Sequence, residues 1–234
     1  MRVFAFLFAF LLACLLAPHA LAIPTHVEAE YRISTSGITI GRVSETYVRE
    51  GDTYRIESTT RTEGVFKLFR DDTVVLVSEG RLGPGGLQPL RFEQKRAGDR
   101  SRDILADFDW AKSLMHSEYR GEATTHPLPP GTQDRLSLMY QFMNVVPQGE
   151  RIRMHMSNGR KVELYTYRKV DEPRLATPAG EFATAHYERV TESEKESRAQ
   201  LWIAKDRYNI AVRVVFEDAN GLRLEQTIMS LTAR

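Results

Sequence analysis

Cysteine is almost absent from this sequence, which contains a single residue of the type, Cys14. We predict that residues 1–22 are removed during export, which would leave the mature chain without any cysteine. Disulfide bonds, thiolate nucleophiles and cysteine metal ligands are then excluded. The stability of the mature protein must come from a hydrophobic core, and about 210 residues are enough to build one.

An excess of charge of one sign is also missing. Loss of Arg2 with the first 22 residues leaves 31 basic residues against 31 acidic residues, a net charge of zero. The basic residues are spread along the chain rather than gathered in one segment. We therefore expect no nucleic-acid partner and no electrostatic attachment to anionic membranes.

Catalytic and cofactor motifs are absent as well. The histidines are far apart, and neither H-E-x-x-H nor H-x-H occurs. No G-x-S-x-G segment offers a serine nucleophile. The glycine-rich residues 83–86 lack the Lys-Ser/Thr pair of a phosphate-binding loop. These absences predict no cofactor and no metal site, and they favour a protein that is not an enzyme.

The N-terminal segment has the pattern of a signal peptide. Arg2 precedes an unbroken apolar run over residues 3–17, and Ala20 and Ala22 are the small residues of a cleavage site. The run is short for a membrane span, so we expect cleavage after Ala22, a periplasmic location and no transmembrane segment in the mature chain. Lipid attachment at Cys14, which ends a Leu-Leu-Ala-Cys segment, is the alternative.

Most of the remaining chain has the pattern of strands and turns. Apolar and polar side chains alternate over residues 151–156, which indicates a half-buried strand. Asn158-Gly159 follows and predicts a hairpin turn, a position in which both residues need positive φ. Similar units recur without a dividing linker. We predict a mainly β fold in which residues 23–234 form a single domain, a curved antiparallel sheet or an open barrel or sandwich.

One segment departs from this pattern and predicts a helix of about three turns near residues 133–146. Thr132 or Asp134 would cap its start, and Pro147 prevents a long continuation. Its apolar face should lie on the sheet. Four apolar residues have the i, i+3, i+4, i+7 spacing of one helical face, namely Leu136, Met139, Tyr140 and Met143.

The stretch LWIAKDRYNIAVRVVF, residues 201–216, predicts two strands joined by a polar turn. A third strand follows, so that the three form a meander. We expect Trp202 to be a core residue, because large aromatic side chains are usually buried. We expect Asp206 and Asn209 to form the turn by bonding their own backbone.

Several stretches of the sequence, taken together, are similar to a known protein family. GTQDRLSLMYQF, RLATPAGEFATAHYE and LWIAKDRYNIAVRVVFEDANG resemble, in this order, exported bacterial proteins of the domain of unknown function 3108 family. The resemblance covers residues 27–230 and implies an exported, mainly antiparallel β protein from a Gram-negative bacterium. It implies no catalytic residue. Under it, Asp134, Gly180, Trp202 and Asp206 are signature positions.

Three functional hypotheses follow. The first is a periplasmic, non-enzymatic protein that binds a lipid-like or apolar ligand or supports the cell envelope, because methionine is abundant and suits adaptable apolar surfaces. The second is an envelope hydrolase or metal-dependent enzyme that uses Asp107, Asp109 or Asp134, although the first two are more typical of a solvated strand face. The third is a scaffold that binds an envelope protein partner through a sheet edge. The predicted ligand contacts of the first hypothesis are Trp110, Tyr140, Met143 and Trp202.

Overall fold

The structure is a computed structural model that describes residues 23–64, 73–193 and 195–234. The predicted signal peptide, including Cys14, lies outside these residues. The helical segments are η3 (Arg100–Arg102), a 3-10 turn, and α2 (Ser137–Asn144). The strands are β1 (His26–Thr35), β2 (Ile38–Glu50), β3 (Thr53–Thr62), β4 (Thr73–Gly83), β5 (Gly86–Arg96), β6 (Ile104–Asp109), β7 (Leu114–Tyr119), β8 (Glu122–Pro127), β9 (Gln133–Asp134), β10 (Arg151–Ser157), β11 (Val162–Asp171), β12 (Arg174–Thr177), β13 (Gly180–Arg189), β14 (Arg198–Ala204), β15 (Ile210–Glu217) and β16 (Arg223–Ala233).

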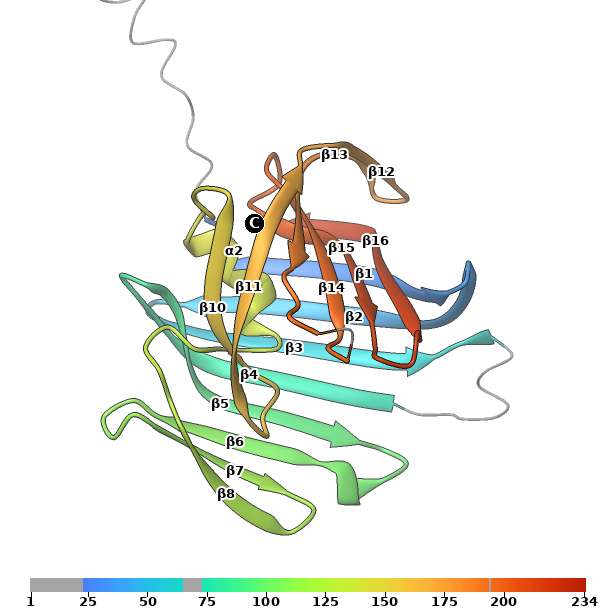
Figure 1. The fold of residues 1–234 in the computed structure, drawn as a ribbon. Coiled ribbons are helices and arrows are strands. Elements are labelled where there is room, and N and C mark those ends of the chain that lie inside the picture. Colours follow the sequence, from blue (N-terminus) through green and yellow to red (C-terminus); the bar gives the residue numbers. More distant parts are fainter. Residues whose placement is uncertain (1–22, 65–72, 194) are drawn as a thin grey trace, which may run out of the picture.

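One open sheet contains all of these strands (Figure 1). Their order is β8-β7-β6-β5-β4-β3-β2-β1-β16-β15-β14-β13-β11-β10-β9, with β12 attached to β13. The pairings are antiparallel except that of the two-residue β9, which runs parallel to β10. Strand β1 lies between β2 and β16, so the first and last strands meet inside the sheet. The prediction of a mainly β, curved antiparallel sheet is confirmed.

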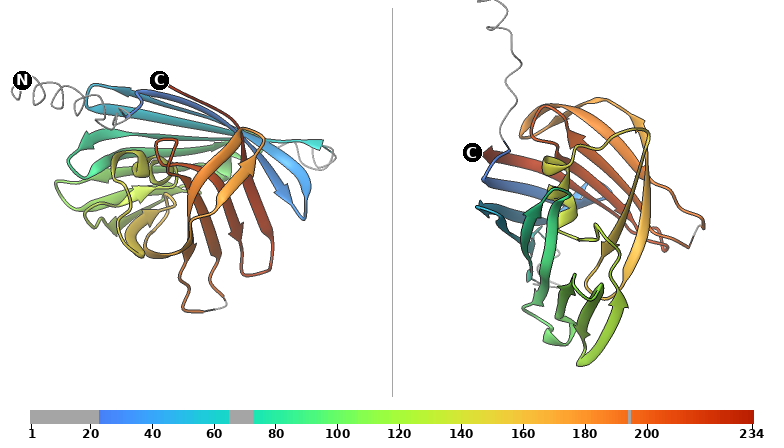
Figure 2. Two further views of the ribbon diagram at one scale, coloured as in Figure 1. Left: turned by 90° about the horizontal axis from the view of Figure 1, so that it is seen from above. Right: turned by 90° about the vertical axis from the view of Figure 1, so that its left-hand side faces the viewer.

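The sheet curls around α2, which the right-hand view of Figure 2 shows between two sets of strands. We call β1–β8 the N-terminal arm and β10–β16 the C-terminal arm. Leu136, Tyr140 and Met143 pack into the core of the N-terminal arm, whereas Leu138 and Phe142 pack into the core of the C-terminal arm. Burial on two sides stabilises a helix that would be too short to form alone.

The predicted helix is therefore present but differs from the expectation in two respects. It spans eight residues, about two turns, because Gln133 and Asp134 pair with β10 as the short strand β9. It also buries more than one apolar face, since the second arm covers the side that would otherwise face solvent. Met139 borders the cores of both arms.

The predicted hairpin joins β10 to β11, with Ser157 opposite Val162. Its turn contains four residues rather than two. Gly159 has a φ of 83°, whereas Asn158 does not adopt positive φ and acts through its side chain. The Asn158 Oδ1 accepts hydrogen bonds from the backbone N–H groups of Arg160 and Lys161, at 2.9 and 3.1 Å.

The tip of this hairpin packs on the inner face of the N-terminal arm. The Gly159 carbonyl oxygen accepts a hydrogen bond from the Ser117 hydroxyl at 2.5 Å. A Cβ atom at position 159 would lie 2.7 Å from Ile104 Cγ2 and 2.9 Å from Phe92 Cδ1, so glycine is required here. This contact joins the two arms by packing, at a position separate from the pairing of β1 with β16.

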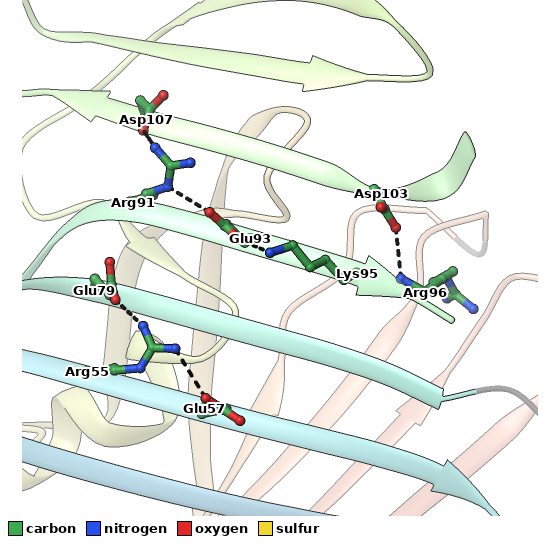
Figure 3. Close-up of polar contacts among 9 residues, drawn as sticks. All are labelled: Arg55, Glu57, Glu79, Arg91, Glu93, Lys95, Arg96, Asp103 and Asp107. Carbon is green, nitrogen blue, oxygen red and sulfur yellow. Dashed lines mark hydrogen bonds and ion pairs between the residues drawn. The ribbon is translucent and has the colours of Figure 1, made fainter. Parts of the chain in front are cut away.

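The outer face of β3–β6 carries a ladder of opposite charges (Figure 3). Arg55 pairs with Glu57 and Glu79, and Arg91 pairs with Glu93 at 2.8 Å. These side chains alternate with buried residues along each strand, which is the pattern of a sheet with one solvated face. Such exposed pairs contribute little stability, but they fix which face of the strands is in water.

The predicted C-terminal meander is confirmed as β14, β15 and β16. Trp202 is 8% exposed, and its ring stacks on His186 with 4.1 Å between ring centroids. The Arg213 guanidinium lies over the same ring, 4.8 Å from its centroid. Trp202 is therefore a core residue, as predicted.

The turn before β15 differs from its prediction. Asp206 Oδ2 accepts a hydrogen bond at 3.1 Å from the N–H of Ala183, on the neighbouring strand β13, rather than from its own turn. Asn209 contributes a positive φ of 55°, as does Tyr208. Asp206 thus ties the turn to β13.

Candidate functional site

The start of α2 is held by a buried carboxylate. Asp134 Oδ1 accepts hydrogen bonds from the N–H groups of Leu136 and Ser137 at 2.8 and 2.9 Å, and Oδ2 accepts one from the Ser78 hydroxyl of β4 at 2.5 Å. The N-cap position is Leu136, which has no side-chain cap bond, so Asp134 is not the N-cap residue that was predicted, although it binds the N–H groups at the start of the helix. Burial raises the pKa of Asp134, while these hydrogen bonds act in the opposite direction. The carboxylate links the helix to the N-terminal arm.

A second buried carboxylate lies further along the helix. Glu45 accepts hydrogen bonds from the hydroxyls of Tyr140 and Ser58, each at 3.1 Å, and burial raises its pKa. The Tyr140 ring also stacks on Tyr47 with 5.3 Å between centroids. Glu45 was not predicted from the sequence. A signal was present, since alternation along β2 puts Val43, Glu45 and Tyr47 on the same buried face.

Arg135 behaves differently from its buried neighbours. Its side chain is exposed, while the residues on either side of it are buried. Among the described residues it has no hydrogen-bond or ion-pair partner.

Half-buried apolar side chains border the cores on both sides of α2. They come from both arms and from the helix. These residues are Leu76, Met139, Ile152, Met154, Met156, Val162, Tyr165 and Val214.

The four predicted ligand contacts are mostly packed inside the protein. Tyr140, Met143 and Trp202 are 1%, 4% and 8% exposed. Trp110 is half-buried and donates its indole N–H to the Pro89 carbonyl at 2.6 Å. Their role in binding stays a prediction. The apolar side chains that remain half-buried beside α2 form a different set, which includes Met139 and Met154.

Two cavities lie elsewhere, on either side of Tyr119. One of about 550 Å³ lies at the ends of β5–β7 and is lined mainly by polar residues such as Arg100, Asp103 and Arg120. The other, about 360 Å³, lies between β7, β8 and the tip of the β10–β11 hairpin. Neither cavity is lined by any of the four predicted ligand contacts.

The acids of the enzymatic hypothesis do not come together. Asp107 is on the outer face, where it pairs with Arg91 at 3.4 Å (Figure 3). Asp109 pairs with Lys112 at 3.0 Å and accepts a hydrogen bond from its N–H. Asp134 is buried on the inner side. Within the described ranges, no group of three histidine or acidic residues is arranged to hold a metal ion.

The signature positions have structural explanations. Gly180 has a φ of 125°, which favours glycine, at the turn into β13. Asp134 accepts hydrogen bonds at the start of α2, and Trp202 is packed in the core. Asp206 accepts a hydrogen bond from the backbone of β13.

No helix in the described part of the chain is both long and apolar enough to cross a membrane.

Comparison with known proteins gives the fold and the family. The chain is similar to a β-barrel-like protein of domain of unknown function DUF1849 from Brucella abortus, with a TM-score of 0.57 and 11% identity over 90% of this chain and 98% of that one. A protein of Bacteroides fragilis described as a candidate exported protein with a YmcC-like fold gives a TM-score of 0.40 and 11% identity, over 89% and 96% of the two chains. A candidate lipoprotein of Parabacteroides distasonis gives 0.38 and 12%, over 89% and 95%.

No curated protein matches the chain. The family model described as "Protein of unknown function (DUF3108)" matches residues 30–227, as the resemblance implied. The chain therefore belongs to the DUF3108 family.

Proposed function

We propose that this chain is a non-enzymatic protein of the cell envelope that binds a lipid-like ligand between the two arms of its sheet. In this proposal, residues 1–22 are a signal peptide cleaved after Ala22, and residues 23–234 form one periplasmic domain. Attachment of a lipid to Cys14 is the alternative, and it would hold the same domain at a membrane.

One observation carries the proposal. Away from the paired strands β1 and β16, the two arms meet through α2 and the tip of a hairpin, and apolar side chains beside this junction remain half-buried. Met139, Met154 and Tyr165 are examples from three different elements. Methionine side chains adapt to ligands of irregular shape, so this interior suits an alkyl chain better than a rigid polar molecule.

The test begins with protein purified from its own host, in which native mass spectrometry should detect a co-purifying lipid. Delipidated protein should then bind a fluorescent alkyl probe. Met154→Gln is expected to weaken probe binding, because Met154 borders the core on the inner face of β10. Leu164→Gln is the matched control, since Leu164 lies on the opposite face of β11 and is 44% exposed. Clean protein that binds no alkyl probe would refute the proposal.

A second function is favoured by the edge strand β8. Five of its six residues are exposed, and β7 is its partner on one side while the other side ends the sheet. An unprotected edge can accept a strand from a protein partner. Crosslinking in cells from a position on β8 should then capture one partner repeatedly, and a scatter of unrelated proteins would count against this function.

The enzymatic hypothesis receives no support from the positions of its acids, because Asp134 is buried on the inner side, away from Asp107 and Asp109, and the latter two are paired with Arg91 and Lys112.

A further inference from the structure

We infer that the cavity of about 360 Å³ between β7, β8 and the tip of the β10–β11 hairpin is a second binding site, for a small sugar that carries one carboxylate or phosphate group. This inference goes beyond the proposed lipid site and does not depend on it. The lining of the cavity shares none of the apolar side chains that border the cores beside α2.

One wall of the cavity is the inner face of β7 and β8. Alternation along β8 puts Glu122, Thr124 and His126 on one face. That face is the inner one, because Thr124 lies opposite the buried Ser117 and His126 lies opposite the buried Met115. Thr124 Oγ1 and His126 Nε2 are 3.1 Å apart and form a hydrogen bond, which orders both side chains. Strand β8 thus presents a carboxylate, a hydroxyl and an imidazole to the cavity.

The opposite wall is the hairpin tip, which is fixed in place before any ligand enters. The Gly159 carbonyl accepts the hydrogen bond of the Ser117 hydroxyl at 2.5 Å. Within the tip, Asn158 Oδ1 accepts a hydrogen bond from the Arg160 N–H at 2.9 Å. The Arg160 guanidinium reaches across to β7, where it lies 4.1 Å from the centroid of the Tyr119 ring. Walls held in one arrangement reduce the entropy that binding costs.

The charges of the lining select an anion. Arg160 and Lys161 outweigh Glu122, so the lining carries a charge of +1 when His126 is neutral. Lys161 also pairs with Glu163 at 2.8 Å, which makes Arg160 the main cation of the cavity. Other exposed arginines also lack an ion pair, but Arg160 lines a cavity and is ordered by its contact with a ring. A guanidinium presents parallel N–H donors that match carboxylate and phosphate oxygens.

The remaining lining groups select hydroxyls. Glu122 would repel a second anionic group but accepts hydrogen bonds from neutral donors. Thr124 can both donate and accept, and the turn contacts of Asn158 use its oxygen rather than its NH2 group. Tyr119 is the single large apolar surface of the lining, so an alkyl chain would gain little there. A monosaccharide with one acidic group combines these features, and the cavity has the volume of a small-molecule site.

The experiment is calorimetric titration of the mature protein, residues 23–234, with D-glucuronate, glucose 6-phosphate and glucose. Wild type should bind at least one acidic sugar about tenfold to a hundredfold more tightly than glucose, as expected for a hydrogen bond to a charged group. Arg160→Gln should remove this preference, and Arg160→Lys should retain part of it. Thr124→Val should weaken the binding of all three sugars. Arg153→Gln is the matched control, because Arg153 is an exposed arginine of β10 outside the cavity lining, and it should keep the full preference.

The outcomes decide the inference separately from the lipid proposal. Equal affinity of wild type for acidic and neutral sugars, or no binding of any of them, would overturn it. A preference that survives in Arg160→Gln would also overturn it, because the anion would then bind elsewhere. Acetate or inorganic phosphate that binds as tightly as the acidic sugars would overturn the sugar as the ligand class. The alkyl probe of the lipid test should bind Arg160→Gln as it binds wild type, so either proposal can fail alone. If Arg160→Gln does not fold, the wild-type preference and the Arg160→Lys and Thr124→Val variants decide.

Discussion

Replacement of Trp202 by alanine is expected to lower the free energy of unfolding by about 3–5 kcal/mol, the usual cost of truncating a large buried aromatic side chain. Part of this cost comes from specific contacts. The stack on His186 is worth about 0.5–1.5 kcal/mol, and the cation–π contact of Arg213 about 0.5–1 kcal/mol. The rest comes from the cavity that would open among the surrounding apolar residues.

Urea denaturation of the purified variant measures this cost, and the melting temperature should fall by about 6–20 °C for a chain of this size. Trp202→Phe keeps an aromatic ring and should cost clearly less. Asp206→Ala leaves the Ala183 N–H without its acceptor, so it should cost about 1–3 kcal/mol, also less than the loss of the Trp202 ring. A wild-type midpoint for Trp202→Ala would refute the conclusion that this residue holds the core together.

Two further predictions concern the inner face of the sheet. Burial raises the pKa of Glu45 above 4.5, so the folded protein retains this proton longer than the unfolded chain, and wild-type stability should fall as the pH rises from 4.5 through the raised value. Glu45→Gln should remove this fall in a series of urea midpoints, and identical pH profiles would contradict the argument. Gly159→Ala should cost about 1–3 kcal/mol by overpacking against Ile104 and Phe92, in addition to the cost of its positive φ. Gly221→Ala isolates the second cost, because Gly221 has a φ of 82° and open space around it, and equal melting temperatures of the two variants would contradict the packing.

The sequence was informative wherever a local pattern decides the structure. Alternation over residues 151–156 identified β10, and the spacing of Tyr140 and Met143 identified the helix. Both depend on periodicity within a few residues. The helix was nevertheless predicted too long, because the pairing of Gln133 and Asp134 with β10 is a tertiary contact that periodicity does not contain.

The candidate site could be predicted only in part, for the same reason. Asp134 was expected to be the N-cap; it binds N–H groups at the helix start from a position before the N-cap, and its bond from Ser78 crosses 56 positions of sequence. Asp206 was expected to bond within its own turn, whereas the N–H group that donates to it belongs to Ala183, 23 residues earlier.

The pairing of β1 with β16 has a consequence for how the chain folds. The backbone contacts at this position join Thr25 to Arg234, which are 209 residues apart, and they lie in the interior of the sheet rather than at an edge. Closing so long a loop costs entropy before any contact repays it, and contacts of this kind slow folding. In a chain delivered N-terminus first, the hairpins of β2–β5 can form early, but β1 keeps one unpaired edge until β16 arrives. During that interval the edge is open to other chains, so an early intermediate is the form most exposed to aggregation and most in need of a chaperone.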